Sequence, residues 1–441
     1  MEMKETKIGF CIPEFDPIRL KDFLSSNDDG KWGSDHNGEN DIAVVRSTNF
    51  NDTGYLDLSD VALRTLSDDD YQKTKLLEND IVIERSGGSA NQPVGRVSFV
   101  TKEIEDTGFG FSNFIQRIRV SDEYNAKYVF YCLYHLHSAG ITQTMQTQTN
   151  GIRNLEYRYY LNQKLPKPSP IEQTQIANFL SAVDKTIQAT KNSIAKLEKL
   201  KTSLMQNLLT GKMKPDGSWR KEDEFWIDDK FGKVPKGWKI SYLKDVQDIN
   251  KESLPASTDP NYTLKYITIE AVFTDRIDFD KVPEYKFSEA PGRARRIIKK
   301  GDFIVSTVRP NLKGFARLQE EGDNWICSTG FATVSPIEKQ VSNFYFFQIL
   351  SFIGEKQFAS FISGSNYPAV TDRDFKQLKV YEAPFEEQIE IANKIESVVT
   401  IINKKQNSIN QLDKLKKSLM QNLLTGKVRI PQEALKNESN G

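Results

Sequence analysis

Two polar, glycine-bearing segments are rich in Arg, Asn, Gln and Lys. Residues 85–96 read Arg-Ser-Gly-Gly-Ser-Ala-Asn-Gln-Pro-Val-Gly-Arg, and residues 306–314 read Ser-Thr-Val-Arg-Pro-Asn-Leu-Lys-Gly. Arginine binds guanine and Asn or Gln binds adenine through paired hydrogen bonds, so such loops are equipped to read DNA base edges. The alternative is a pair of ordinary solvated hairpins. The candidate contacts are Arg85, Ser89, Asn91, Gln92, Arg96, Thr307, Arg309, Asn311 and Lys313.

A second pair of candidate segments lies further along the chain. Residues 148–154 read Gln-Thr-Asn-Gly-Ile-Arg-Asn, and residues 364–371 read Gly-Ser-Asn-Tyr-Pro-Ala-Val-Thr. Their candidate contacts are Asn150, Arg153, Asn366 and Tyr367. The basic run at 293–296, with two lysines at 299–300, is a candidate for holding phosphates, and a solvated charge run is the alternative.

The first pair of loops follows matching strand-like segments. Residues 78–83 (Glu-Asn-Asp-Ile-Val-Ile) resemble residues 300–305 (Lys-Gly-Asp-Phe-Ile-Val), and Leu-Lys-Asp occurs at both 20–22 and 243–245. Strand-like runs alternate with helix-like runs such as 128–135. These echoes predict two recognition modules of one α/β (mixed α+β) fold with different surfaces.

The segment that follows each module is duplicated. Residues 171–212 recur without a gap at 386–427, with 24 of 42 positions identical. Residues 199–212 return with Lys417 in place of Thr202 as the only change. Two unlike modules are therefore each followed by the same connector.

Both connectors carry a heptad pattern, with apolar residues at alternating steps of four and three. The seam comprises Ile176, Leu180, Val183, Ile187, Ile194, Leu197, Leu204 and Leu208, and then Ile391, Ile395, Val398, Ile402, Ile409, Leu412, Leu419 and Leu423. Plain packing in a helical bundle is the alternative to a coiled coil. Polar residues such as Ser203 and Gln206 also recur, as Ser418 and Gln421, which indicates that one partner binds both copies.

Helix boundaries are marked at both ends. Ser169 to Glu172 form a capping box with proline at the first helical position, Pro384 precedes the second helix, and Gly211 and Gly426 suit left-handed caps. About 35 residues at ~1.5 Å each give a helix of about 50 Å. The chain leaves the first helix at its C-terminal end, so compact modules favour an antiparallel coiled coil with pseudo-two-fold symmetry.

Composition narrows the class of protein. The sequence has 60 basic and 60 acidic residues, so any grip on nucleic acid depends on local patches or partners. Three cysteines without paired spacing predict neither a disulfide framework nor a thiolate metal site. The absence of a signal-peptide core and of long apolar runs predicts a cytoplasmic location and no membrane association.

Motifs for catalysis are missing. The sequence has no Asn/Asp-Pro-Pro-aromatic tetrad for base methylation and no Gly-Lys-Ser/Thr phosphate loop, so we expect no enzyme activity from this chain. The acids at Asp216 and 222–224 fall in a polar linker and are expected to be solvated. His135 and His137 lack metal-ligand spacing and are interpreted as structural.

The chain resembles the specificity subunit of type I restriction-modification systems. Each connector has Glu-Gln near its start (172–173 and 387–388) and ends Ser-Leu-Met-Gln-Asn-Leu-Leu-Thr-Gly-Lys. Pro-Lys-Gly-Trp at 235–238 and the Gly-Asp strand at 301–302 are similar to those of its target recognition domains. The first module lacks the Pro-Lys-Gly-Trp opening.

The resemblance implies that each module binds one half of a bipartite, asymmetric target in double-stranded DNA, while the helices set the spacer. It also implies two docked methyltransferase subunits, joined by restriction/translocase subunits for cleavage in a prokaryotic cytoplasm. S-adenosylmethionine, ATP and Mg would belong to those partners, and this chain would bind no cofactor. Rival interpretations are a coiled-coil scaffold with two protein-binding heads and an enzyme with an unrecognised site.

The predicted organisation has five parts. They are a first recognition domain at 1–168, its helix at 169–212, a linker and second recognition domain at 213–383, its helix at 384–427, and a tail at 428–441.

Overall fold

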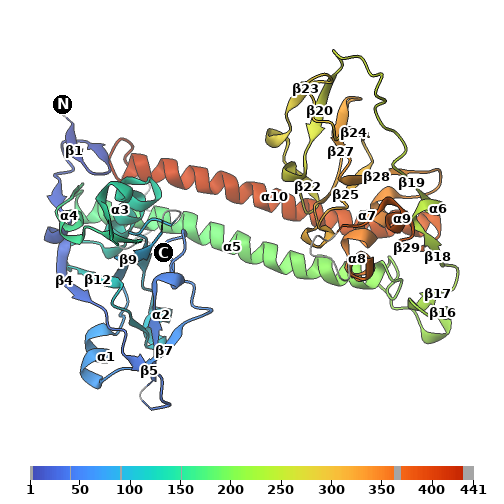
Figure 1. The fold of residues 1–441 in the computed structure, drawn as a ribbon. Helices are drawn as coiled ribbons and strands as arrows, with labels where there is room; N and C mark the ends of the chain where they lie inside the picture. The colour runs from blue at the N-terminus through green and yellow to red at the C-terminus, as the bar shows by residue number, and fades with distance from the viewer. Residues whose placement is uncertain (1–2, 40, 90–91, 150, 362–368, 431–441) are drawn as a thin grey trace. The chain divides into compact units, whose positions relative to one another are not determined.

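The computed structural model describes residues 3–39, 41–89, 92–149, 151–361 and 369–430 (Figure 1). The chain divides into two compact units. The first comprises Met1–Lys191 with Asn407–Gly441, and the second comprises Asn192–Gln406. Each long helix therefore contributes one half to each unit.

The first unit is built on two four-stranded sheets. In one, the order is β10-β8-β12-β4, all antiparallel; in the other it is β11-β6-β7-β5, with β6 and β11 parallel. The strands are β4 (Leu24–Asp29), β5 (Ser34–Asp35), β6 (Asp41–Val45), β7 (Ala62–Thr65), β8 (Ile81–Glu84), β10 (Val97–Phe99), β11 (Gly110–Phe111) and β12 (Ile115–Val120). Central strand β8 is buried along its whole length.

The second unit repeats this plan with different residues. Its sheets have the orders β26-β25-β28-β19 and β24-β27-β20-β23, and β20 pairs in parallel with β27. The strands are β19 (Gln247–Ile249), β20 (Thr263–Ile267), β23 (Glu284–Lys286), β24 (Ala294–Ile297), β25 (Phe303–Ser306), β26 (Phe315–Arg317), β27 (Trp325–Ser328) and β28 (Phe331–Pro336). The prediction that the two modules share a mixed α/β fold is confirmed.

The sequence echo before the central strands has a structural cause. Asn79 and Gly301 both have positive φ, at 69° and 90°. The buried carboxylate of the next residue, Asp80 or Asp302, then accepts a hydrogen bond from the backbone N–H three residues earlier, at 2.9 and 2.8 Å. The same turn therefore starts β8 and β25.

Short helices complete each core. In the first unit, α3 (Ala126–Ser138) buries six consecutive residues, 128–133, in a core that it shares with the sheet and with both long helices. In the second, α7 (Ser342–Leu350) and α8 (Phe352–Phe361) take this role. The predicted helical segment 128–135 lies in α3.

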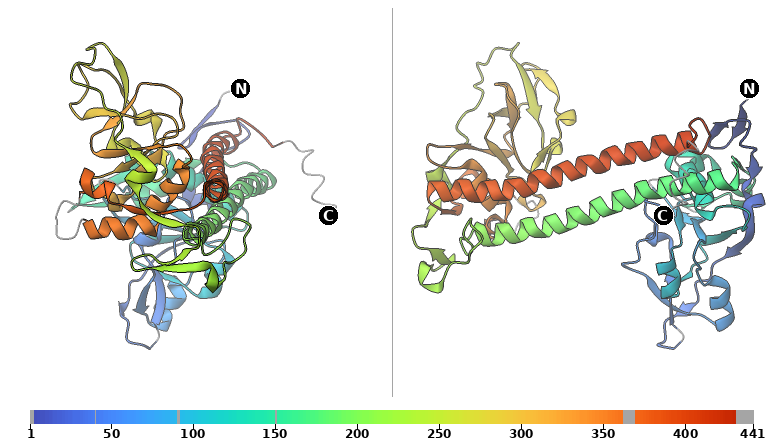
Figure 2. Two further views of the ribbon diagram at one scale, coloured as in Figure 1. Left: turned by 90° about the vertical axis from the view of Figure 1, so that its right-hand side faces the viewer. Right: turned by 180° about the vertical axis from the view of Figure 1, so that it is seen from behind.

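Two helices of 39 residues each, α5 (Pro170–Leu208) and α10 (Phe385–Leu423), follow the modules (Figure 2). At ~1.5 Å per residue each is about 58 Å long. Ser169 and Glu172 form the predicted capping box. Gly211 and Gly426 have φ of 66° and 73°, so both helices end in left-handed caps as predicted.

Within each unit, the two helix halves pack through the seam. In the first unit, Ile176 and Leu180 of α5 share a core with Met420 and Leu423 of α10. In the second, Met205 and Leu208 of α5 share a core with Ile391 and Ile395 of α10. All sixteen predicted seam residues are buried or half-buried.

Candidate nucleic-acid interface

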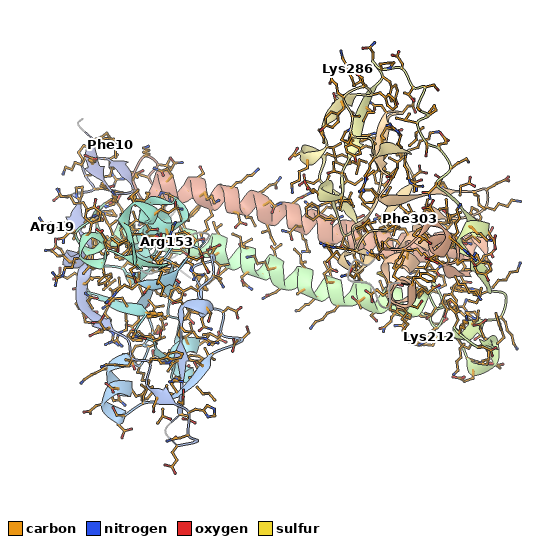
Figure 3. All side chains as sticks on the ribbon, viewed as in Figure 1. Phe10, Arg19, Arg153, Lys212, Lys286 and Phe303 are labelled. Carbon is orange, nitrogen blue, oxygen red and sulfur yellow. The ribbon has the colours of Figure 1, made fainter. Side chains whose placement is uncertain are left out.

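The structure brings together the two candidate segments of the first unit. Strand β9 (Ser86–Gly88) pairs with β14 (Ile152–Leu155), which pairs with β13 (Gln146–Thr149). Arg153 lies opposite Gly88, and the Ser86 hydroxyl donates to Asn154 Oδ1 at 2.5 Å. Residues 86–88 and 152–155, which are distant in sequence, therefore lie in one three-stranded sheet with β13 (Arg153 is labelled in Figure 3).

Several predicted residues of segments 85–96 and 148–154 reach solvent. Ser89 and Gln92 are exposed and close a tight turn through mutual backbone hydrogen bonds of 2.9 and 3.2 Å. Arg85 is 41% exposed and donates to Asp29 at 2.6 Å and Gln116 at 3.0 Å. Arg153 is half-buried.

Arg96, by contrast, is buried. Its guanidinium donates to both Glu84 carboxylate oxygens, at 2.8 and 2.7 Å, and to the Phe50 and Ser47 carbonyls. The two charged side chains are 6% and 1% exposed. Burial raises the pKa of Glu84, and the Arg96 charge opposes that rise. These partners give the Arg96 guanidinium a structural role inside the unit, while its contact with DNA stays a prediction.

In the second unit the corresponding segments also meet. The Val370 N–H donates to the Thr307 carbonyl at 2.8 Å, and Val308 forms an isolated antiparallel bridge with Ala369. Thr307 donates both its N–H and its hydroxyl to Gly330 O at 2.9 Å, so this side chain fixes the loop. The predicted contacts Asn91, Asn150, Asn366 and Tyr367 lie outside the described residues.

The tip of the 306–314 loop is a short 3-10 turn, Pro310–Leu312. Arg309 and Lys313 flank it with positive φ of 50° and 52°. Arg309, Asn311 and Leu312 are exposed, whereas Lys313 pairs with Glu355 of α8. A positive φ costs free energy for arginine unless the surrounding structure stabilises it. This backbone conformation therefore indicates a loop held in a shape that exposes its side chains.

Most of the basic run is paired within the protein. Arg296 contacts Asp372 at 3.2 Å. Lys299 contacts Glu252 at 2.8 Å and Lys300 contacts Glu321 at 2.6 Å. These carboxylates reduce the positive charge available for phosphates, while Arg293 remains exposed.

Exposed apolar side chains beside both loops gave no signal in the sequence. Ile152 is 44% exposed on β14, and Leu312 is 68% exposed at the loop tip. Phe114 is 43% exposed and lies next to Gly87 of β9. Apolar groups of this kind suit the methyl group of thymine. Periodicity identifies buried faces, so it could not single out apolar residues that stay in solvent.

Each module is joined to its helix by the same glutamine. Gln173 Oε1 accepts from the Asn125 N–H at 2.9 Å, and its amide donates to Pro168 O at 3.0 Å. Gln388 Oε1 accepts from the Val341 N–H at 3.0 Å, and its amide donates to Ala383 O at 2.8 Å. Both glutamines are fully buried, which explains why a polar residue recurs in a helix.

The glutamate that precedes each of these glutamines also forms an ion pair in each unit. Glu172 pairs with Arg429 in the first unit, and Glu387 pairs with Arg220 in the second. The Trp238 indole N–H donates to Glu387 at 2.8 Å. This contact explains the Pro-Lys-Gly-Trp segment, since its tryptophan docks on the start of α10.

Other polar contacts with the helices differ between the two units. In the first unit, Lys416 of α10 lies 2.6 Å from Asp184 of α5, which also accepts from the Tyr131 hydroxyl at 2.8 Å. In the second, Arg317 of β26 binds two carboxylates, Asp275 of its own module and Glu396 of α10. Burial raises the pKa of Asp275 despite this arginine. Each module is thus anchored to a helix carboxylate, through the Tyr131 hydroxyl in the first unit and the Arg317 guanidinium in the second.

The described residues contain no group of three or more His, Cys, Asp or Glu side chains suited to a metal ion. His135 is buried and contacts Gln421 at 3.0 Å, and burial lowers its pKa. No helix within the described ranges is both long and apolar enough to cross a bilayer.

The model of the type I restriction modification DNA specificity domain matches residues 13–199 and again residues 235–413. These two matches cover most of the chain, so it belongs to this family and carries two target recognition domains. It is a specificity subunit of the type I restriction-modification class.

Known proteins agree with this assignment. The MjaVIII specificity subunit of Methanocaldococcus jannaschii is 26% identical over 365 residues, covering 80% of both chains. The putative MjaX specificity subunit of the same organism is 23% identical over 438 residues, covering 97% of this chain and 96% of the relative.

The fold has solved counterparts. The S subunit from M. genitalium aligns with a TM-score of 0.58 at 14% identity, covering 92% of this chain and 95% of that one. A chain from a type I system solved to explain complex assembly and conformational transition gives 0.51 at 15% identity, covering 95% and 99%.

Proposed function

We propose that each unit reads one half of a bipartite, asymmetric double-stranded DNA target through its pair of adjoining polar loops. The observation that carries this proposal is the repeated juxtaposition. Segments 85–96 and 148–154 adjoin in one unit, and segments 306–314 and 369–371 adjoin in the other. The loops occupy matching places in one fold yet share almost no residues, as expected of two readers of different sequences.

The helices α5 and α10 set the distance between the half-sites as an antiparallel coiled coil. Two facts support this role. The start of α5 packs with the end of α10 in the first unit, and the end of α5 packs with the start of α10 in the second. Half-sites one DNA turn apart are separated by ~34 Å, a distance within reach of helices about 58 Å long.

A repeated apolar residue supports docking of two methyltransferase subunits on the helices. Leu200 and Leu415 occupy the same position in the two copies and are 46% and 48% exposed. Each lies between repeated, exposed neighbours, a lysine before it and a serine three residues after it. A seam residue would be buried, so identity at an exposed position points to a partner that meets both copies alike.

In this assembly the chain is a non-catalytic subunit that works in the prokaryotic cytoplasm. The methyltransferase subunits bind S-adenosylmethionine, and restriction/translocase subunits use ATP and Mg. A coiled-coil scaffold with two protein-binding heads is the competing assignment.

Co-expression with the methyltransferase of the same system tests the proposal. Methylated adenines are mapped in the host genome by single-molecule sequencing, with the methyltransferase expressed alone as control. We expect one split motif with a fixed gap. A stable complex that methylates without a motif would favour the scaffold.

Docking is tested separately with Leu200→Asp and Leu415→Asp. Each single variant should retain one methyltransferase and the double variant none, as measured by the mass of the purified complex. Leu63→Asp, at an exposed leucine of the first unit's sheet, is the control and should keep both. Unchanged stoichiometry in the double variant would place the docking surface elsewhere.

A further inference from the structure

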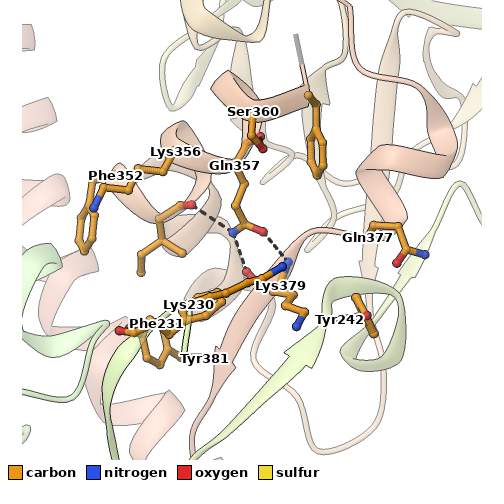
Figure 4. Close-up of a pocket in the computed structure, with 12 residues that line it drawn as sticks. Lys230, Phe231, Tyr242, Phe352, Lys356, Gln357, Ser360, Gln377, Lys379 and Tyr381 are labelled. Atoms are coloured by element: carbon orange, nitrogen blue, oxygen red, sulfur yellow. Dashed lines mark hydrogen bonds between the residues drawn. The ribbon is translucent and has the colours of Figure 1, made fainter. Parts of the chain in front are cut away.

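The second unit contains a surface cleft whose described lining lies outside the predicted recognition segments 306–314 and 364–371. Its volume is about 420 Å³, and it lies between α8, the strand pair β18 (Lys239–Tyr242) and β29 (Lys379–Glu382), and the hairpin of β16 (Phe225–Asp228) and β17 (Gly232–Pro235). Figure 4 shows the residues that line it. The volume is in the range of small-molecule sites.

The floor of the cleft is fixed. Gln357 of α8 exchanges two hydrogen bonds with the backbone of Lys379, both 2.8 Å, which join the helix to β29 (Figure 4). Its amide also donates to Ile353 O at 3.1 Å. The cleft therefore keeps its shape without a ligand.

The lining combines cations with aromatic rings. Lys230, Lys356 and Lys379 contribute three ammonium groups, and the lining residues that the structure describes include no carboxylate. Lys356 lies 5.5 Å from the Phe352 ring centroid, and Lys379 lies 5.4 Å from that of Tyr242. Lys244 also lies 5.5 Å from the Tyr242 ring centroid, so cations lie beside both of these rings.

The acid that closes the hairpin turn beside the cleft, Asp228, is committed to the backbone. The Asp228 carboxylate accepts from the N–H groups of Lys230 and Phe231, both at 2.8 Å, and closes the hairpin turn. Its pKa is lowered first by these two hydrogen bonds and further by the nearby lysines. The described lining itself carries three lysines and no carboxylate, so its side chains are net positive.

The first unit offers an internal comparison. A hollow of about 620 Å³ occupies the matching place, between the hairpin of β1 (Lys4–Thr6) and β2 (Gly9–Cys11) and the pair of β3 (Ile18–Arg19) and β15 (Lys164–Leu165). Its described lining has no aromatic residue, and it includes two acids, Glu5 and Asp16. Lys4 pairs with Asp16 at 2.8 Å. The combination of rings with unneutralised cations is therefore particular to the second unit.

We propose that this cleft binds a nucleoside phosphate, with the base against Phe352 or Tyr242 and the phosphates on Lys230, Lys356 and Lys379. Aromatic rings stack on any base, and lysine ammonium groups bind phosphate as point charges. A purely anionic ligand would leave the rings unused, and an uncharged aromatic ligand would leave the lysines unused. The ligand is either a free nucleotide or one nucleotide of a single strand, and the described lining shares no residue with the recognition segments 306–314 and 364–371.

Isothermal titration of the full chain with ATP, adenosine, tripolyphosphate and a thymidine tetranucleotide tests the proposal. We expect saturable binding of ATP or the tetranucleotide, with adenosine and tripolyphosphate each about tenfold weaker. The double variant Lys356→Ala/Lys379→Ala should weaken binding about tenfold or more, and Tyr242→Leu should weaken it with the charges intact. Binding of ATP alone identifies a free nucleotide, and binding of the tetranucleotide alone identifies a strand.

Matched controls separate the cleft from general basic surface. Lys286→Ala removes an exposed lysine of the same unit, on β23 and away from the cleft lining, and should leave binding unchanged (Lys286 is labelled in Figure 3). Lys7→Ala, in the hollow of the first unit, should also have no effect. The proposal is overturned if no probe binds, if tripolyphosphate equals ATP, if an acidic peptide binds where nucleotides do not, or if Lys356→Ala/Lys379→Ala binds normally.

Discussion

Side chains of one type take opposite roles within a single loop. Arg85 and Arg96 both belong to the polar segment 85–96, yet their side chains are 41% and 6% exposed. The distinguishing feature is Glu84, an acid at the end of a buried strand that requires a cationic partner. The sequence shows that the loop is polar. It does not show that Arg96 forms an ion pair with Glu84, because that pairing depends on strand register.

Arg96→Ala should destabilise the first unit. The substitution leaves Glu84 buried without its partner, and breaking such a pair costs about 3–5 kcal/mol. The change is measured by urea unfolding, followed by a probe in the first unit. Arg85→Ala, which breaks an exposed pair, is the control and should cost less than about 1 kcal/mol. A stable Arg96→Ala variant with an altered target sequence would identify Arg96 as a DNA contact.

Arg309→Ala should relax recognition of one half-site only. Arg309 is exposed on the loop of the second unit, and a paired arginine–guanine contact contributes about 1–3 kcal/mol of discrimination. The readout is the methylated motif, compared with that of Arg153→Ala in the first unit, which should affect the other half. Equal loss at both halves, or no loss at either, would contradict the assignment of this loop.

At the scale of elements, the sequence predicts features that depend on neighbouring residues more accurately than pairings between strands that are distant in the chain. The capping box at Ser169, the glycine caps and the heptad seam depend on residues within one or two turns, and all are present. The pairing of β9 with β14 was not predicted, because it joins residues 68 positions apart, such as Ser86 and Asn154. Such pairing depends on the sheet order, which one sequence does not reveal.

Gln388→Ala should loosen the second module from α10. It leaves the Val341 N–H and the Ala383 carbonyl without their side-chain partner, and an unsatisfied buried group costs about 1–3 kcal/mol. Hydrogen exchange should accelerate at the start of α7 and stay unchanged in the first unit. Gln206→Ala, at an exposed repeated glutamine, is the control. Faster exchange in both units, or in neither, would contradict a local role of Gln388 in holding the second module to α10.

At the scale of the molecule, the chain is one plan used twice. The duplication, the two modules of one fold and the family resemblance were all predicted from sequence, and the two family matches agree with them. The domain boundaries and the individual DNA contacts stay predictions. Loop composition indicates what a surface can bind, but the pose on DNA depends on the assembled complex.

Removing one heptad from each helix should shorten the gap in the target. Deletion of 193–199 together with 401–407 preserves the phase of the seam and removes ~10 Å, the length of about three base pairs. The gap is measured by mapping methylated adenines. Deletion of four residues from α5 alone shifts its seam and should abolish recognition. A methylated motif with the original gap would contradict the proposal that the two helices set the distance between the half-sites.

The contacts by which Gln173 and Gln388 hold the modules to the helices have an evolutionary consequence. On the module side, both glutamines accept from a backbone group, the N–H of Asn125 or of Val341, and Gln388 also donates to the Gln340 side chain at 2.9 Å. Every residue except proline supplies a backbone N–H, so the contact of Gln173 requires no matching side chain in a foreign module. Exchange of modules between genes, at the duplicated segments, can therefore create a new pair of half-sites in a single recombination event.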